Sequence, residues 1–170
     1  MSESISNGFD DLWRANEEYV NTFKYSELTG RAARGLAIVT CMDSRINPLS
    51  VVGMKSGDAK ILRNAGARVT QDVLRTLVLA TYLLGVDRIL VMPHTDCRMA
   101  QEDEEVIHAM IEEKHGVDTR SLEFNTVVDQ RAALSQDLAR IRAFPLIPKN
   151  VIVSGGIYHV VTGKIEPIEN

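Results

Sequence analysis

The chain has two cysteines, and each follows a short apolar run. Cys41 comes directly after LAIVT, and Cys97 ends the segment HTDC, which begins at His94 shortly after a second run, RILVM. Zinc binds thiolate sulfur and imidazole nitrogen well, and three protein ligands leave its fourth tetrahedral position to water or another exchangeable group. These three side chains therefore predict a zinc site of the catalytic kind.

Each of these side chains has a simpler interpretation when it is taken alone. Buried free cysteines usually pack as small hydrophobic residues, and a single histidine is more often a hydrogen-bonded core residue than a ligand. Here both cysteines come at the ends of predicted strands, and one of them forms an H-x-x-C pair with a histidine. This joint placement favours metal binding over packing.

The composition is that of one globular domain spanning residues 1–170. The chain is 45% hydrophobic, carries a net charge of −4 and has no long Lys/Arg run, so nucleic acid is not an expected partner. The first residues lack the pattern of a secretory signal. The longest nearly apolar run, residues 76–86, is shorter than the roughly 20 residues that cross a bilayer, so we expect a cytoplasmic protein without a membrane contact.

Apolar runs and amphipathic stretches alternate along the chain. The predicted strands are residues 36–40, 59–62, 88–92 and 151–153, with a closing hairpin at 157–161 and 163–165, and the predicted helices are 70–84, 102–114 and 126–142. Such alternation is typical of an α/β domain with a mainly parallel central sheet flanked by helices. Functional groups of these sheets gather beyond the carboxyl ends of the strands, where Cys41 and His94 lie.

The segment 9–25 has apolar residues at three- and four-residue intervals, which predicts an amphipathic helix. It contains five of the chain's nine aromatic residues: Phe9, Trp13, Tyr19, Phe23 and Tyr25. This aromatic stripe indicates an N-terminal helical arm, residues 1–28, that packs on its own chain or on a second subunit. An ordinary core helix of the same chain fits the pattern equally well.

Two motifs resemble those of the β-class carbonic anhydrases. That family carries C-x-D-x-R after one strand and H-x-x-C after another, and this sequence has them at Cys41, Asp43 and Arg45, and at His94 and Cys97. The turn RNAG at residues 63–66 also resembles a segment of the family between these motifs. The order of elements agrees as well, so the resemblance covers nearly the whole chain.

The resemblance implies a Zn²⁺ enzyme that reversibly hydrates carbon dioxide to bicarbonate and a proton by means of a zinc-bound hydroxide. Cys41, His94 and Cys97 would bind the metal, and Asp43 would pair with Arg45 beside the open coordination position. Zinc lowers the pKa of bound water from about 15.7 to about 7. An ionised Asp43, held by the planar fork of Arg45, is suited to accept a hydrogen bond from that water.

Asp43 and Arg45 have two further interpretations. They could be surface residues that happen to lie two positions apart. In the family, moreover, the aspartate can bind zinc itself while the arginine releases it, which closes the site; the sequence does not decide between these states.

The substrate pocket is the least specific part of the sequence. Asn64, Ala65 and Gly66 are candidates for its lining, because a glycine lets the backbone approach a small substrate, but a simple tight turn explains Gly66 as well. Members of the family usually have glycine after the second cysteine, whereas this chain has Arg98. This bulky cation could alter the loop, attract bicarbonate or narrow the entrance.

Two other functions fit the same sequence. Relatives within the family hydrolyse carbonyl sulfide or carbon disulfide, which are also small linear molecules. A non-catalytic zinc protein is the third alternative, although Asp43 and Arg45 argue against it. The resemblance further implies a homodimer or homotetramer in which the N-terminal helix reaches a neighbouring subunit.

Overall fold

A five-stranded, mostly parallel sheet forms the centre of the computed structural model, which describes residues 8–168. The strands are β1 (Leu36–Cys41), β2 (Ala59–Asn64), β3 (Arg88–Met92), β4 (Ile152–Tyr158) and β5 (Ile165–Pro167). Their order across the sheet is β2-β1-β3-β4-β5, and only the last pair runs antiparallel. The predicted α/β fold with a mainly parallel sheet is confirmed.

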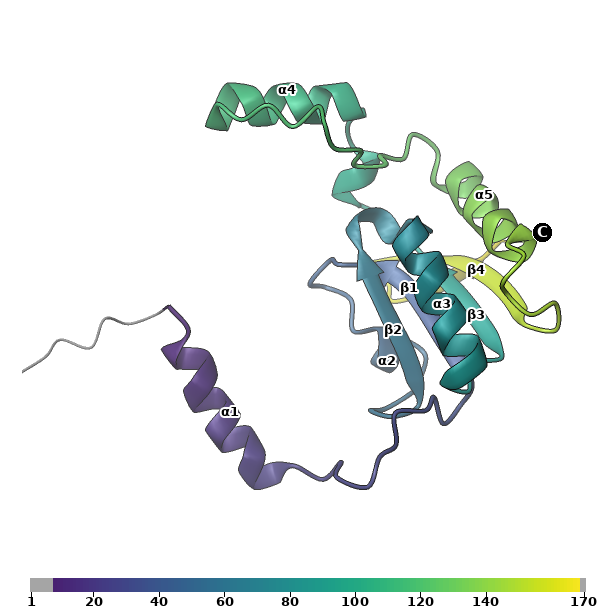
Figure 1. The fold of residues 1–170 in the computed structure, drawn as a ribbon. Helices are drawn as coiled ribbons and strands as arrows, with labels where there is room; N and C mark the ends of the chain where they lie inside the picture. Colours follow the sequence, from purple (N-terminus) through teal and green to yellow (C-terminus); the bar gives the residue numbers. More distant parts are fainter. Residues whose placement is uncertain (1–7, 169–170) are drawn as a thin grey trace, which may run out of the picture.

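Helices cover the sheet and extend beyond it (Figure 1). They are α1 (Asp10–Thr22), α2 (Pro48–Val51), α3 (Gln71–Leu83), α4 (Glu104–His115) and α5 (Gln130–Ala143), with short 3₁₀ turns η1 (Ala65–Ala67) and η2 (Arg98–Ala100). Side chains that accept hydrogen bonds from backbone N–H groups mark three of the helix starts: Asn47 for α2, Thr70 for α3 and Asp129 for α5. None of the helices among the described residues is long and apolar enough to cross a membrane.

All six residues of β1 are buried, because other parts of the chain cover both faces of the sheet at this strand. Ala37 and Val39 point toward a core made with α3 and α5, whereas Leu36 and Ile38 point toward a second apolar cluster that includes Cys41. A strand covered on both faces is apolar throughout, which explains the continuous run in the sequence.

The structure corrects the prediction for the last strands. Residues 151–153 and 157–161 were predicted as separate strands, but β4 runs without a break from Ile152 to Tyr158 and pairs with both β3 and β5. Glycine weakens most strands, which is why the pattern suggested a break here. In this fold Gly155 and Gly156 allow close packing, since a Cβ on Gly156 would come within 2.6 Å of Ile165 Cγ2.

Helix α5 also differs from its prediction, which placed its start at residue 126. The helix begins at Gln130, because the Asp129 side chain accepts hydrogen bonds from the N–H groups of Arg131 and Ala132 and so caps it. The pattern of apolar residues alone did not locate this cap.

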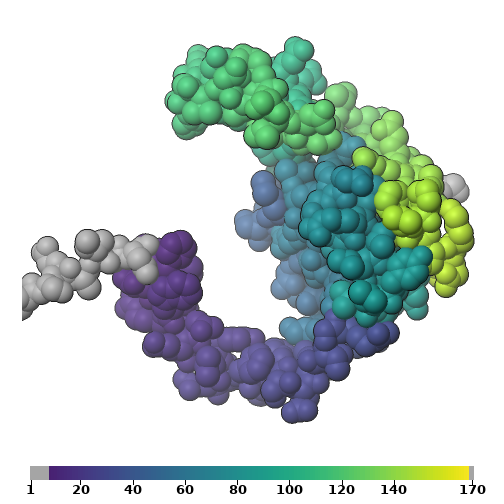
Figure 2. Space-filling model, viewed as in Figure 1, coloured from purple at the N-terminus to yellow at the C-terminus, as the bar shows by residue number. Residues whose placement is uncertain are grey.

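Helix α1 projects away from the sheet, and a hollow separates it from the body of the chain (Figures 1 and 2). Every residue of the helix is exposed, and the Trp13 side chain is 57% exposed. The alternative of a core helix of the same chain is therefore wrong, and the predicted N-terminal helix is observed at residues 10–22. The first seven residues of the predicted arm lie outside the described residues.

A buried ion pair joins η1 to α5. Asp137 accepts hydrogen bonds from Arg68 Nε at 2.9 Å and from the backbone N–H of Val69 at 3.2 Å, and its side chain is only 6% exposed. Arg68 also donates to the backbone oxygen of Asn125. These contacts fix the turn after β2 against the helix that covers the sheet.

We expect Asp137→Ala to lower the free energy of unfolding by about 3 kcal/mol, because it leaves the Arg68 guanidinium without its partner. Asp72→Ala is the matched control, since it removes an exposed ion pair with Arg75 and should cost less than about 1 kcal/mol. Urea-induced unfolding followed by circular dichroism, at equal chain concentrations, measures both. Equal losses for the two variants would contradict the structural role of Asp137.

Candidate metal centre

Cys41, His94 and Cys97 meet at the carboxyl-terminal edge of the sheet. Cys41 is the last residue of β1, and His94 lies just beyond β3, the neighbouring parallel strand. The ligand atoms of the three side chains lie within 4.8 Å of one another, and all three residues are buried. The structure thus brings together the three side chains that the sequence predicts as metal ligands.

The imidazole of His94 is oriented by its own backbone. Nδ1 lies 2.8 Å from the carbonyl oxygen of Thr95, so Nδ1 carries the proton and donates it to that oxygen. Nε2 is then free to bind a metal. Within residues 8–168, it is the one buried side-chain nitrogen or oxygen atom without a hydrogen-bond partner.

The backbone of His94 is held as well. Gln130, the first residue of α5, donates a hydrogen bond from Nε2 to the His94 carbonyl oxygen at 2.6 Å. No pattern in the sequence indicates this contact, because the two residues lie 36 positions apart and no motif links a glutamine to a distant backbone oxygen.

The two cysteines differ in their affinity for protons. Their sulfur atoms lie 4.0 Å apart, and the hydrogen bond from Cys97 lowers the pKa of the Cys41 thiol against the opposing effect of burial. The same contact, together with burial, raises the pKa of Cys97. Two sulfur atoms this close together are suited to bind one divalent cation, which would replace the thiol protons.

The pKa of His94 is raised for a related reason. Burial favours the neutral ring, but the nearby Cys41 sulfur and the Thr95 carbonyl favour the charged ring and outweigh that effect. An unpartnered ring nitrogen beside two sulfur atoms matches the ligand preference of zinc.

Asp43 lies beside this cluster, and the side chain of Arg45 binds its carboxylate. The guanidinium contacts the carboxylate at two points, Nε–Oδ1 at 3.0 Å and Nη2–Oδ2 at 2.7 Å, and the backbone N–H of Arg45 donates to Oδ1. This pairing holds the pKa of the Asp43 carboxyl well below its usual range. Oδ2 is 3.7 Å from His94 Nε2, so an ionised oxygen faces the cluster.

Arg63 fixes the loop that carries Asp43. Its side chain donates to the backbone oxygens of Cys41 at 2.9 Å and of Asp43 at 2.6 Å. Arg63 belongs to the RNAG segment that was noted in the sequence, but spacing alone did not indicate that its side chain reaches the neighbouring strand end.

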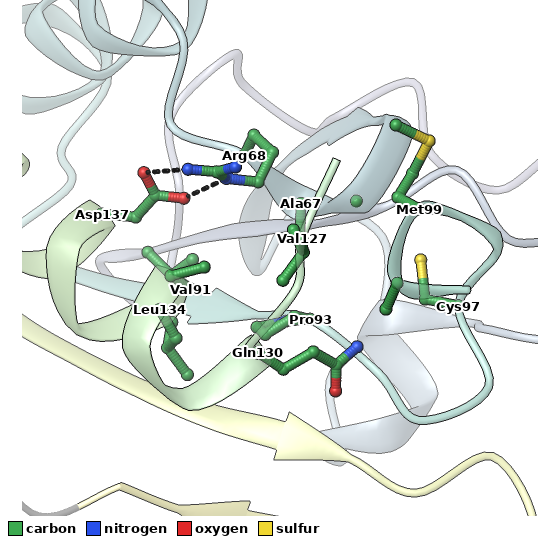
Figure 3. Close-up of a pocket in the computed structure, with 13 residues that line it drawn as sticks. Ala67, Arg68, Val91, Pro93, Cys97, Met99, Val127, Gln130, Leu134 and Asp137 are labelled. Carbon is green, nitrogen blue, oxygen red and sulfur yellow. Dashed lines mark hydrogen bonds and ion pairs between the residues drawn. The ribbon is translucent and has the colours of Figure 1, made fainter. Parts of the chain in front are cut away.

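A small, mainly apolar cavity opens next to Cys97 (Figure 3). Most of its wall comes from η1, the end of β3, η2 and α5, and includes Gly66, Ala67, Val91, Pro93, Met99 and Leu134. The ion pair of Arg68 and Asp137 also lies on this wall (Figure 3).

The three predicted pocket residues have different positions. Gly66 lies on the cavity wall with a φ of +80°, and a Cβ there would come within 3.2 Å of Met99 Cβ. Asn64 instead shapes the turn, because its side chain bonds both the N–H and the carbonyl group of Arg68. Ala65 packs against the apolar cluster around Cys41.

The side chain of Arg98 contacts residues other than the metal ligands. Its guanidinium donates to Gln101 Oε1 at 3.1 Å, lies 3.7 Å from a carboxylate oxygen of Glu102 and contacts the sulfur of Met110. Arg98, at the position where the family usually has glycine, therefore links η2 to α4.

Three comparisons with known proteins agree with this geometry. A family model described as carbonic anhydrase matches residues 36–165. Beta-carbonic anhydrase 1 of Mycobacterium tuberculosis is 34% identical over 160 residues, covering 94% of this chain and 96% of the relative. A carbon disulfide hydrolase of Acidithiobacillus thiooxidans is 30% identical over 154 residues, covering 79% of this chain and 77% of the relative.

Among solved structures, a carbonic anhydrase from Streptococcus mutans superposes with a TM-score of 0.89 at 36% sequence identity, and the match covers 97% of this chain and 99% of that one. The range matched by the family model includes the strand ends that carry the cysteine and histidine cluster. This chain belongs to the β-carbonic anhydrase family of enzymes.

Proposed function

We propose that this protein is a cytoplasmic zinc enzyme that reversibly hydrates carbon dioxide to bicarbonate and a proton. The observation that carries the proposal is the buried Nε2 atom of His94, which has no hydrogen-bond partner and faces two cysteine sulfurs. Leaving such an atom unsatisfied costs about 1–3 kcal/mol, and a metal ion at this position removes that cost.

Cys41, His94 and Cys97 would hold the zinc ion and leave one tetrahedral position open. When bound, zinc supplies a nucleophilic oxygen at neutral pH by lowering the pKa of its water. Two thiolates neutralise much of the metal charge, so neighbouring protein groups must help to orient the water.

Asp43 would provide that orientation. Because Arg45 stabilises its ionised form, the carboxylate remains a hydrogen-bond acceptor throughout the ordinary pH range. With zinc bound, the Asp43 carboxylate would accept a hydrogen bond from the reacting water and so orient that water toward the substrate.

The cavity beside Cys97 would receive carbon dioxide. Its walls are mainly aliphatic, which suits an uncharged molecule without hydrogen-bond donors. Gly66 and Met99 both contribute to this wall.

Hydrolysis of carbon disulfide or carbonyl sulfide is the second candidate. It is favoured by the similarity to a carbon disulfide hydrolase and by the apolar character of the cavity, which accepts these substrates equally well. A non-catalytic zinc protein is the third alternative, and the assays below separate it from both enzymes.

Helix α1 supports a proposal on assembly. Its aromatic residues are about half exposed, with Trp13 at 57% and Tyr19 at 49%, and such a surface is typical of protein interfaces. We propose that α1 packs on a second copy of this chain, in a homodimer or a homotetramer.

Metal analysis tests the ligand set. We expect purified protein to hold about one zinc ion per chain and Cys97→Ser to lose most of it, because the hydroxyl of serine is a much weaker ligand than thiolate. His115→Ala, at an exposed position on α4, is the control that should keep its metal. Elemental analysis of dialysed samples gives the result, and a full zinc content in Cys97→Ser would refute the site.

Stopped-flow measurement of carbon dioxide hydration on metal-quantified protein tests the activity. We expect Asp43→Asn to lower kcat/KM roughly 10- to 100-fold while zinc content stays unchanged, because the amide presents an N–H donor where an acceptor is needed. Asp72→Asn, on the surface of α3, should have the wild-type rate. Hydrogen sulfide release from carbon disulfide, without carbon dioxide hydration, would support the second candidate instead, and inactivity toward both would support the third.

Removal of residues 1–24 tests the assembly. We expect the truncated chain to sediment as a smaller species in analytical ultracentrifugation, because the aromatic surface that joins two copies is gone. A full-length variant with Trp13→Ser and Phe23→Ser should also sediment as a smaller species, although its chain length is unaltered. Truncated protein with the assembly of the full-length chain would contradict the role of the arm.

A further inference from the structure

Asp96 lies inside the H-x-x-C segment, and its carboxylate faces the arginine of the other motif. Oδ2 accepts a hydrogen bond from Arg45 Nη1 at 2.7 Å, and the backbone oxygen of Asp96 accepts one from Arg45 Nη2 at 3.0 Å. We propose that Asp96 is a positioning residue, which holds Arg45 in the one orientation that places Asp43 beside the metal ligands.

The guanidinium of Arg45 donates hydrogen bonds to two aspartates at once. Nε and Nη2 bind Asp43, while Nη1 and the other side of Nη2 bind Asp96. Arg45 is 45% exposed, and an exposed ion pair with one partner restrains a long side chain only weakly. A second anionic partner on the opposite edge of the fork fixes its plane.

The backbone of Asp96 is adapted to this contact. Its φ of +54° lies in the left-handed region, where residues with a side chain are uncommon. A glycine would adopt this conformation without strain, yet the position holds an aspartate whose side chain and carbonyl oxygen both reach Arg45. Gln101 Nε2 donates to the other carboxylate oxygen at 3.2 Å and so orients the group from behind.

Asp96 thereby couples two loops of the site. Asp43 and Arg45 follow β1, whereas Asp96 lies in the loop after β3, directly before Cys97. The contact of Arg45 with both carboxylates sets the distance between the Asp43 oxygen and the His94 ring. In the sequence, the position of Asp96 is only a spacer in H-x-x-C, so the pattern did not indicate a role for its side chain.

Two substitutions test this role. Asp96→Gly keeps the left-handed backbone and removes the carboxylate, and Asp96→Asn keeps one acceptor oxygen and removes the charge. We expect the Nε–H proton of Arg45 to exchange with water roughly two to five times faster in Asp96→Gly than in wild type, with Asp96→Asn between them. Nitrogen-15 NMR of arginine-labelled, zinc-loaded protein measures this exchange, and the Arg45 signal is assigned by its loss in Arg45→Lys.

Asp118→Asn is the matched control, because it removes an exposed partner of a different arginine, Arg120. It should leave the Arg45 signal unchanged. Zinc content and Tm should stay at wild-type values in the Asp96 variants. If Asp96→Gly does not fold, the test rests on Asp96→Asn alone. An unaltered rate of Arg45 Nε–H exchange in the folded variants would overturn the inference.

The kinetic consequence rests on the proposed hydration activity. We expect Asp96→Gly to lower kcat/KM roughly two- to fivefold in the wild-type background and to have no further effect in Arg45→Ala, because it acts only through that arginine. Additive losses would overturn the inference. The NMR readout needs no turnover, so a protein that lacks hydration activity but shows faster Arg45 exchange refutes the proposed function and supports the role of Asp96.

Discussion

The parallel register of β1 and β3 is the constraint on which the site depends. Val39 lies opposite Val91 and Thr40 opposite Met92, so Cys41 and His94 leave the sheet side by side. The hydroxyl of Thr40 donates to the Met92 carbonyl at 2.7 Å and reinforces this alignment. A slip of one residue would turn the side chains of one strand to the opposite face, which would separate the ligands and expose the core.

The local patterns of the sequence predicted the elements that this register aligns. Strands β1 and β3 are short and apolar, and the chemistry and placement of Cys41, His94 and Cys97 at their ends led to the prediction of a zinc site. The patterns did not predict contacts between distant positions, such as Gln130 with the His94 backbone or Asp137 with Arg68. Such contacts depend on tertiary packing, and no residue spacing encodes them.

Tertiary packing also explains where the predicted strand boundaries were wrong. Gly155 and Gly156 suggested a break, although β4 is continuous, because their role is to let α5 and β5 approach the strand. The pattern of the N-terminal helix was correct, but it could not show whether the aromatic face meets its own chain. Periodicity identifies an apolar face, and only the path of the connecting chain decides what lies against it.

The site combines a rigid part with an adjustable one. Cys41, His94 and Cys97 are buried at strand ends, where packing leaves their side chains little freedom. Asp43 and Arg45 lie on a more exposed loop, and hydrogen bonds rather than packing determine their orientation. Because water competes for such bonds, the orientation needs several partners at once. For the proposed enzyme, this division implies that metal affinity follows the stability of the fold, whereas reactivity depends on a polar network that can change without unfolding the sheet.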